Sequence, residues 1–281
     1  MTVLDDLVAG AKQRMAVRES QVTFEEIKQR AQAAAPAKNV VEALTGSPGA
    51  VSIIAEIKRA SPSKGYLASI PDPAELASIY EAGGAAMVSV LTEELRFNGS
   101  LEDLASVRKA IDIPVLRKDF IVTPYQVHEA RAYGADAVLL IVAALEQTVL
   151  VSLIERVTSL GMTPLVETHS RLEVFRALDA GARVIGVNAR NLKNFHVDNH
   201  LVEEVLDAIP AGVVAVAESG VSSSEDVMDY AMAGADAVLI GEALVTANSP
   251  GDQIREMVSV GQHPALQRDR KKRVRLSREE I

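Results

Sequence analysis

Four stretches of the chain repeat one pattern, in which a glycine and an alanine lead into an apolar run. The stretches are GGAAMVSVL (83–91), GADAVLLIV (134–142), GARVIGV (181–187) and GADAVLIG (234–241). A glycine just past the end of a helix suits the left-handed cap conformation. The pattern therefore predicts a repeating unit of helix, glycine turn and buried strand.

Four further apolar runs complete a set of eight predicted strands. They cover residues 51–58, 113–118, 162–167 and 213–218. The strands recur every roughly 20–35 residues, the usual repeat of a βα unit. Eight such units predict an α/β fold, a (β/α)8 TIM barrel with an N-terminal helical extension. The alternative is an open doubly wound sheet, but the GxGxxG turn that usually follows its first strand is missing after Lys58.

Helix start signals stand between the predicted strands. The stronger ones are Asp72-Pro73 with Glu75 and Thr123-Pro124 with Gln126, and the weaker ones are Ser222 with Glu225 and Ser100 with Asp103. Each joins an N-cap residue to a polar partner three residues later, which is the pattern of a capping box.

We expect residues 1–262 to form a single (β/α)8 barrel domain, with the helical extension over about residues 1–50. Residues at helical spacing in the extension are Leu4, Leu7, Val8, Ala11 and Met15, and Thr23 with Glu26 is a capping box for a second helix. We expect the extension to cover one end of the barrel core. The alternative is that it shapes the mouth of a substrate site.

The last residues, 263–281, form a basic tail. Its segment RDRKKRVR (268–275) holds six basic residues and one acidic residue. We expect this tail to be flexible and solvated, and contact with nucleic acid is the alternative.

Composition limits the class of protein. Of the 281 residues, 48% are hydrophobic and 4% aromatic, a balance that suits a parallel sheet covered by helices. A net charge of −9 argues against a general nucleic-acid binder, and the lack of cysteine excludes disulfides and thiolate metal sites. No signal peptide or apolar run of about 18 residues is visible. We therefore expect a cytoplasmic protein that binds neither membrane nor nucleic acid, and a monomer, since no apolar helix face stands out.

The segment IIAEIKRASPSKG (53–65) places charge at the end of a buried strand. Glu56 and Lys58 are two residues apart, so they project from the same face of the strand. Burying charge costs on the order of several kcal/mol unless the charge is paired or used. A loop rich in serine, lysine and glycine follows at once, as at the edge of an active site, and we expect residues 61–67 to be mobile.

Polar residues stand at the ends of seven of the predicted strands. They are Glu56 and Lys58, Thr92 and Glu93, Arg117 to Asp119, Glu167 to His169, Asn188 to Asn191, Glu218 to Gly220, and Glu242. In a (β/α)8 barrel the active site lies at the carboxyl ends of the strands. Any one of these residues could form an ion pair that only stabilises the rim, but the seven ends together indicate a catalytic site.

Two glycine turns indicate a phosphate site. Ser219-Gly220 follows the seventh strand and Gly241-Glu242 follows the eighth, where barrels of this kind recurrently bind phosphate. Glycine lets the backbone and its N–H groups approach an anion closely. The alternative is that these glycines only turn the chain. We expect the Glu242 side chain to point away, because its carboxylate would repel a phosphate. No metal site is predicted, since the five histidines are scattered without HExxH spacing.

Six motifs make the chain resemble the indole-3-glycerol phosphate synthases. They are AEIKRASPSKG, VLRKDF, LVETH, IGVNARNL, AESGV and AVLIGEALV, in the family's order, over roughly residues 2–260. The resemblance implies an enzyme of tryptophan biosynthesis, a carbon–carbon lyase that needs no cofactor or metal. It would close, decarboxylate and dehydrate 1-(2-carboxyphenylamino)-1-deoxyribulose 5-phosphate, its small phosphorylated substrate. The products would be indole-3-glycerol phosphate, CO2 and water.

The resemblance also implies roles for individual residues. Lys118 would be the general acid that protonates the ketone oxygen, and Glu167 the second proton-transfer residue. The other implied catalytic residues are Glu56 and Lys58, and the implied substrate-binding residues are Ser61, Asn188, Arg190, Glu218, Ser219, Gly220, Gly241 and Glu242. A lysine beside other cations has a lowered pKa, so we expect Arg117 or Lys58 to lower that of Lys118.

Two alternative functions share this fold. One is another phosphate-binding barrel, such as phosphoribosylanthranilate isomerase, and the other is a non-catalytic barrel that binds a sugar phosphate. Two lysines and two acids at the strand ends, Lys58, Lys118, Glu56 and Glu167, favour the synthase.

Overall fold

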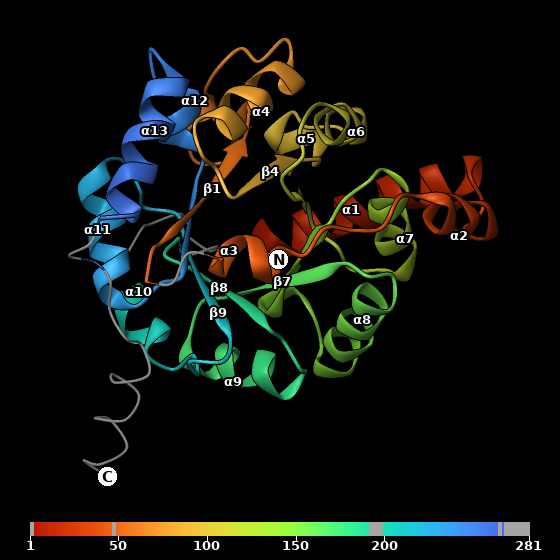
Figure 1. Cartoon of the computed structure of the whole chain (residues 1–281). Helices are drawn as coiled ribbons and strands as arrows, with labels where there is room; N and C mark the ends of the chain where they lie inside the picture. The colour runs from red at the N-terminus through yellow and green to blue at the C-terminus, as the bar shows by residue number, and fades with distance from the viewer. Residues whose placement is uncertain (1–2, 47–48, 191–198, 264–265, 267–281) are drawn as a thin grey trace.

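The computed structural model describes residues 3–46, 49–190, 199–263 and 266, and in them eight parallel strands close into a barrel (Figure 1). The order around the barrel is β1-β10-β9-β8-β7-β6-β5-β4, so strands that follow one another in the chain are neighbours. The strands are β1 (Ser52–Ile57), β4 (Met87–Leu91), β5 (Val115–Lys118), β6 (Ala137–Ile141), β7 (Thr163–Thr168), β8 (Val184–Asn188), β9 (Val214–Glu218) and β10 (Ala237–Ile240). The predicted (β/α)8 barrel is confirmed, with each strand inside its predicted range or one residue beyond it.

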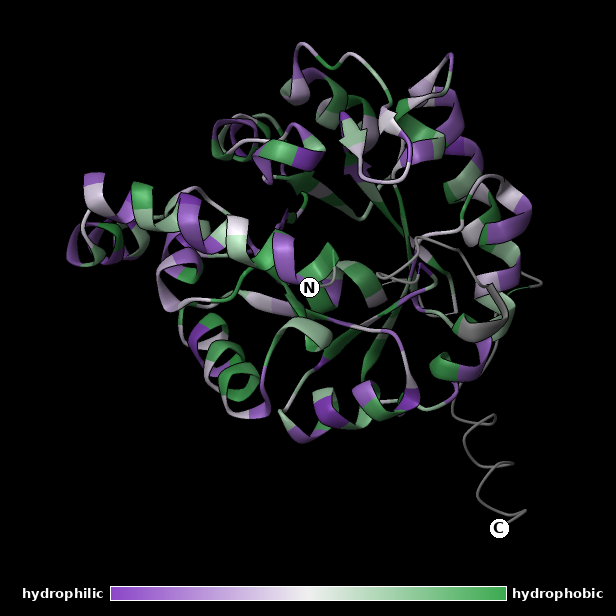
Figure 2. Cartoon of the chain, turned by 180° about the vertical axis from the view of Figure 1, so that it is seen from behind, coloured by the Kyte–Doolittle hydropathy of each residue, from purple (hydrophilic) through white to green (hydrophobic). Residues whose placement is uncertain are grey.

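Helices cover the outside of the barrel. They are α4 (Pro73–Ala82), α6 (Leu101–Ala110), α7 (Pro124–Ala132), α8 (Gln147–Ser159), α9 (Arg171–Asp179), α10 (Asn199–Leu206), α11 (Ser224–Ala233) and α13 (Pro250–Gly261). Short elements lie in the loops: β2 (Ala60–Ser61), β3 (Gly65–Tyr66), α5 (Glu94–Phe97), η1 (Val142–Ala144) and α12 (Glu242–Val245). Figure 2 shows apolar strands inside and polar residues on the outer faces of the helices. None of these described helices is both long and apolar enough to cross a membrane.

The turns between helices and strands follow the predicted glycine pattern. Gly84, Gly134, Gly181 and Gly234 all have positive φ, which glycine adopts without the strain that a Cβ would add. The capping box of Thr123 with Gln126 at the start of α7 is confirmed.

The start of α11 corrects one prediction. Its N-cap is Ser223 and the capping-box acid is Asp226, not Ser222 with Glu225. The Asp226 carboxylate accepts from the backbone N–H groups of both Ser222 and Ser223, at 2.8 and 3.0 Å, so the box closes one residue later than predicted.

The N-terminal extension forms three helices that reach both ends of the barrel. They are α1 (Val3–Gln21), α2 (Phe24–Ala33) and α3 (Val40–Thr45). Val40 and Leu44 of α3 pack into the apolar interior of the barrel, and the Leu44 carbonyl accepts from Ser52 Oγ at the start of β1. Figure 1 shows α3 over the middle of the ring of strands.

The first helix lies at the other end of the barrel. Leu7 of α1 lines the cavity at the carboxyl ends of the strands, whereas Leu44 of α3 contacts the start of β1. The extension therefore does both things that the sequence left open, since α3 covers the core and α1 shapes the mouth. The basic segment 268–275 lies outside the described residues.

Alternation along the strands sorts the barrel interior into layers. On β9, Val214 and Val216 point into the barrel core, while Ala215 and Ala217 pack against the outer helices. Glu218 follows on the inward face. In this fold, one interior layer takes its side chains from alternate strands. The layer nearest the carboxyl ends therefore receives charged rather than apolar side chains.

Candidate active site

A cavity of about 610 Å³ opens at the carboxyl ends of the strands. All twelve predicted catalytic and binding residues line it: Glu56, Lys58, Ser61, Lys118, Glu167, Asn188, Arg190, Glu218, Ser219, Gly220, Gly241 and Glu242. Because parallel strands bring their carboxyl ends to one edge, residues far apart in the chain meet here.

Four charged side chains, three buried carboxylates and one partly buried lysine, form the floor of the cavity. They are Glu56 on β1, Lys118 on β5, Glu167 on β7 and Glu218 on β9, one from every second strand of the barrel. Lys118 Nζ lies 3.2 Å from Glu218 Oε2 and 3.6 Å from Glu56 Oε2. We call these four residues the charged layer.

Glu56 is shared between two lysines. Its Oε1 lies 2.8 Å from Lys58 Nζ, and its Oε2 faces Lys118 and accepts from Ser89 Oγ at 3.4 Å. Burial raises the pKa of Glu56, but Lys58 and Lys118 outweigh burial and the pKa lies below its usual value. Glu56 is therefore an anion that fixes both ammonium groups at the bottom of the cavity.

The surroundings of Lys118 correct the prediction of a lowered pKa. Burial lowers the pKa of Lys118, but Glu218, Glu56 and Glu167 together raise it above the usual value. The ammonium faces three carboxylates rather than other cations. Lys118 is consequently a charged donor at neutral pH.

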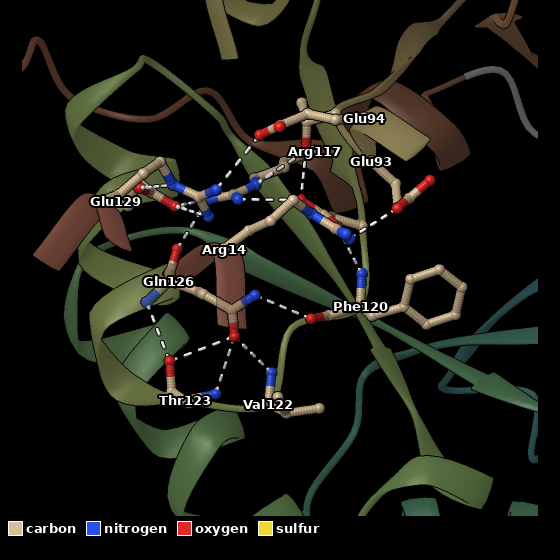
Figure 3. Close-up of polar contacts among 12 residues, drawn as sticks. Arg14, Glu93, Glu94, Arg117, Phe120, Val122, Thr123, Gln126 and Glu129 are labelled. Atoms are coloured by element: carbon tan, nitrogen blue, oxygen red, sulfur yellow. Dashed lines mark hydrogen bonds and ion pairs between the residues drawn. The ribbon is translucent and has the colours of Figure 1, made fainter. Parts of the chain in front are cut away.

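Arg117 lies on the other side of the strand from Lys118. Its side chain is fully buried between the strand and α7, where it donates to Asp119 Oδ2, to Glu129 Oε2 and to Thr92 Oγ1 at 3.0, 3.0 and 3.1 Å. Neighbouring residues in a strand face opposite sides, which is why Arg117 does not lower the pKa of Lys118. Figure 3 shows Arg117 and Glu129 in the same polar network.

Glu218 has an unusual titration for a carboxyl group. Burial raises its pKa, Lys118 lowers it and Glu167 raises it again, with the result at about 7. The group therefore changes its charge near neutral pH, where it can take up or give a proton next to Lys118.

Glu167 is paired outside the layer with a histidine. Its Oε1 lies 3.4 Å from His169 Nε2, and the other ring nitrogen of His169 lies 3.4 Å from Glu173 Oε2. Burial lowers the pKa of His169, but the hydrogen bond with Glu173 and the charge of Glu167 raise it above its usual value. His169 thus lies between the carboxylates of Glu167 and Glu173.

The loop after β1 reaches across the mouth to the later loops. Arg190 Nη1 donates to Ser63 Oγ at 3.2 Å, and the Arg190 N–H donates to Asn188 Oδ1 at 2.9 Å. Lys64 forms an ion pair with Glu242. The Glu242 carboxylate is therefore held by a lysine at the mouth, which offsets its repulsion of an anion.

Glycine is needed after β9 and after β10 for different physical reasons. Ser219 and Gly220 both have positive φ, 67° and 79°, so this turn needs a left-handed backbone. At Gly241 the reason is space, because a Cβ there would lie 2.5 Å from Glu56 Oε1 and 2.9 Å from Lys58 Nζ. Gly241 therefore leaves room for the Glu56–Lys58 ion pair, besides bringing backbone close to a ligand.

Sequence reasoning missed the apolar wall of the cavity and one buried hydroxyl. Leu7, Phe97 and Phe120 line the cavity, and the two phenyl rings lie 6.4 Å apart between centroids. Ser89 donates to Glu56 from inside β4. A single serine in the apolar run MVSVL was the available signal for Ser89, whereas the wall joins segments that only the fold brings together.

The described residues contain no group of three histidine, cysteine, aspartate or glutamate side chains placed to hold a metal ion. The carboxylates of the charged layer are instead matched by the ammonium groups of Lys58 and Lys118.

Comparisons with known proteins place this chain in a family. A family model described as indole-3-glycerol phosphate synthase matches residues 4–257. An indole-3-glycerol phosphate synthase of Beutenbergia cavernae is 60% identical over 266 residues, which cover 95% of this chain and 98% of that protein. Indole-3-glycerol phosphate synthase 1 of Streptomyces coelicolor is 59% identical over 270 residues, 96% of this chain and 100% of that protein.

Solved structures of lower identity share the fold. A 3-hexulose-6-phosphate synthase from Salmonella typhimurium superposes with a TM-score of 0.63 at 17% identity, covering 76% of this chain and 100% of that chain. At this identity the likeness concerns the barrel alone.

Proposed function

Because this chain belongs to the indole-3-glycerol phosphate synthase family, we propose that its charged layer performs the reaction that defines the family. The function is the synthesis of indole-3-glycerol phosphate. The substrate is 1-(2-carboxyphenylamino)-1-deoxyribulose 5-phosphate, and ring closure, loss of CO2 and loss of water convert it to product. Since a carbon–carbon bond to the carboxyl group breaks, the reaction class is that of a carbon–carbon lyase.

One observation carries the assignment of roles: the Lys118 ammonium sits among three carboxylates at the floor of the cavity. Its raised pKa keeps it protonated, so it binds the substrate ketone as a charged hydrogen-bond donor. As the ring carbon attacks, the ketone oxygen becomes a much stronger base and takes the proton from Lys118. A donor aimed at charge that develops only in the transition state lowers the barrier without over-stabilising the substrate.

Decarboxylation follows from the new bond. The ring carbon that attacked still carries its carboxylate, and the C–CO2 bond breaks so that its electron pair restores the aromatic ring. A carboxylate held firmly by cations would resist this loss. Lys58 is already paired with Glu56, and Lys118 with Glu218. This pairing limits how strongly the two ammonium groups stabilise the substrate carboxylate.

Loss of water needs a second proton transfer, and Glu167 is the residue that the layer offers for it. The hydroxyl leaves with a proton as water, and the neighbouring methylene carbon loses a proton to form the double bond. Glu167 lines the cavity and is paired with His169, so it can exchange a proton during this step.

Two further parts of the cavity suit the two ends of the substrate. Phe97 and Phe120 supply an apolar wall for the phenyl ring. The turns at Ser219-Gly220 and Gly241, with Ser61 and Arg190 nearby, supply N–H groups, hydroxyls and a cation for the phosphate.

Substrate conversion tests the proposal directly. The chain has no tryptophan, so indole fluorescence rises from a low background when substrate is added without metal. Lys118→Ala should lose about 10²–10⁴ in kcat while KM changes little, since a general acid acts in the transition state. No fluorescence from the wild-type protein would refute the function, and equal losses of binding and turnover in the variant would make Lys118 a binding group instead.

A further inference from the structure

Gly186 lies in the middle of β8, on the face that points into the barrel. Its neighbours two residues away on this face are Val184, in the barrel core, and Asn188, in the cavity wall. Gly186 is absent from the residues of positive φ, so its backbone is one that any residue adopts. A glycine inside a strand weakens the strand and often marks a close approach of another group.

The group that approaches Gly186 is the Glu218 carboxylate. A Cβ built on Gly186 would lie 2.0 Å from Glu218 Oε1 and 3.1 Å from Glu218 Cδ. Contacts of a Cβ atom below 3.0 Å essentially never occur, so any side chain here would displace the carboxylate. Space rather than backbone conformation is what requires glycine.

The opposite oxygen of the same carboxylate holds the reactive lysine. Glu218 Oε2 lies 3.2 Å from Lys118 Nζ, and the Glu218 side chain is only 1% exposed. The carboxylate is thus wedged between the bare backbone of β8 on one side and the ammonium on the other. The carboxylate cannot move toward Gly186 without leaving Lys118. It also cannot keep its present position if Gly186 gains a side chain.

We propose that Gly186 is a positioning residue of the active site: the space left by its missing side chain seats the Glu218 carboxylate against Lys118 and so fixes the ammonium where the substrate ketone meets it. The inference rests on the proposed function, in which Lys118 is the proton donor. Gly186 itself touches no reacting atom and acts through Glu218.

The other charges around Lys118 cannot replace Glu218. Glu56 faces Lys118 from β1 at 3.6 Å but is already engaged by Lys58 at 2.8 Å. Glu167 acts on Lys118 from β7 through its charge, and is itself paired with His169. Displacement of Glu218 would therefore let the ammonium shift toward Glu56, and a misplacement of about 1 Å at a reacting group can cost about 10²-fold in rate.

The first experiment compares Gly186→Ala with Gly212→Ala. Gly212 lies in the turn before β9, and a Cβ there would meet no atom within 4 Å, so it adds the same methyl group without crowding. Gly186→Ala should lower kcat about 10²-fold with KM within about threefold of wild type, and Gly212→Ala should change neither. Equal kcat in the two variants would overturn the proposal.

A rescue separates positioning from mere packing. Glu218→Asp shortens the side chain by one methylene, so in the wild-type background it withdraws the carboxylate from Lys118 and lowers kcat. In the Gly186→Ala background the same change relieves the contact with the added methyl group. It should therefore raise kcat at least about tenfold over Gly186→Ala alone. Circular dichroism checks that the single variant Glu218→Asp and the double variant with Gly186→Ala are both folded. If they are, and Glu218→Asp lowers kcat in the Gly186→Ala background as it does in the wild type, Gly186 has no positioning role.

A titration makes the test independent of turnover. The Glu218 carboxyl can be followed by NMR in protein labelled with ¹³C-glutamate, and identified by the signal lost in Glu218→Gln. Its pKa of about 7 in the wild type should rise in Gly186→Ala, because the carboxylate moves away from the Lys118 charge, and stay unchanged in Gly212→Ala. An unchanged pKa in Gly186→Ala would overturn the inference. A wild-type protein without turnover would instead refute the proposed function while this comparison still decides the role of Gly186.

Discussion

Arg18 of α1 donates to both carboxylate oxygens of Glu129 on α7, with Nε 2.6 Å from Oε1 and Nη2 3.1 Å from Oε2. Glu129 also accepts from Arg117 on β5, the residue next to Lys118. One carboxylate therefore links the N-terminal helix to the strand that carries Lys118.

Because of this link between α1 and β5, we expect Arg18→Ala to weaken substrate binding more than it slows the chemical steps. Leu7 on the same helix lines the cavity, so a loosely held α1 leaves the mouth less well formed. We expect KM to rise about fivefold to tenfold, with kcat within about threefold, as steady-state kinetics would show. A rise of 1.4 kcal/mol in binding free energy corresponds to about tenfold. Lys28→Ala, which breaks an ion pair with Glu25 and a cation–π contact with Phe24 on α2, is the control. An equal effect of both variants would speak against the link between α1 and β5.

Arg117→Met should cost stability rather than catalysis. Arg117 is fully buried and its charge balances Asp119 and Glu129. Removing one partner of a buried ion pair leaves uncompensated charge, which typically costs about 3–5 kcal/mol. Urea unfolding would measure the loss. Arg255→Ala removes an arginine from an exposed pair and should change the free energy of unfolding by less than about 1 kcal/mol.

Gly241→Ala should separate Glu56 from Lys58. The new Cβ would press on both members of the pair, at 2.5 and 2.9 Å, and Lys58 would move because its side chain is flexible. We expect kcat/KM to fall by at least about tenfold. If Gly241 served only backbone conformation or phosphate binding, KM for substrate and the inhibition constant of inorganic phosphate would rise together while kcat stayed constant.

Glu218 predicts a specific dependence of stability on pH. Its folded pKa of about 7 is raised above the unfolded value, so its contribution to stability is complete below about pH 4.5 and is lost as pH rises through 7. The difference in unfolding free energy between wild type and Glu218→Gln should therefore fall between these pH values. Chemical denaturation at pH 5, 6, 7 and 8 would measure it, and a difference that grows with pH would contradict the raised pKa.

Much of the barrel was predictable because its signals are local. The glycine–alanine turns and apolar runs fixed the positions of strands such as β6 and β10 to within a few residues. The hairpin of β2 and β3 and the short helix α5 were not predicted, since two-residue strands and a four-residue helix are too short to show a periodicity. The start of α5 is instead held by the Glu93 carboxylate, which accepts from the Arg96 N–H.

The residues of the site were predictable and their partners were not. Parallel strands deliver their carboxyl ends to one edge, so Lys118, Glu167 and Glu218 had to meet once the barrel was predicted. Which charges surround Lys118 depends on how the strands are staggered, and there the prediction of neighbouring cations was wrong. Two signals were available but unused: the alternation that turns Arg117 outward, and the glycine inside β8.

The placement of α3 also constrains how the chain folds during synthesis. Val40 and Leu44 leave the ribosome before any barrel strand, yet they become buried beside residues of β1 and β9, and β9 ends at Glu218. Until most of the chain has emerged, these side chains have no barrel interior to enter. The nascent protein therefore exposes these apolar side chains through most of its translation, and exposed apolar surface of this kind binds chaperones and favours aggregation.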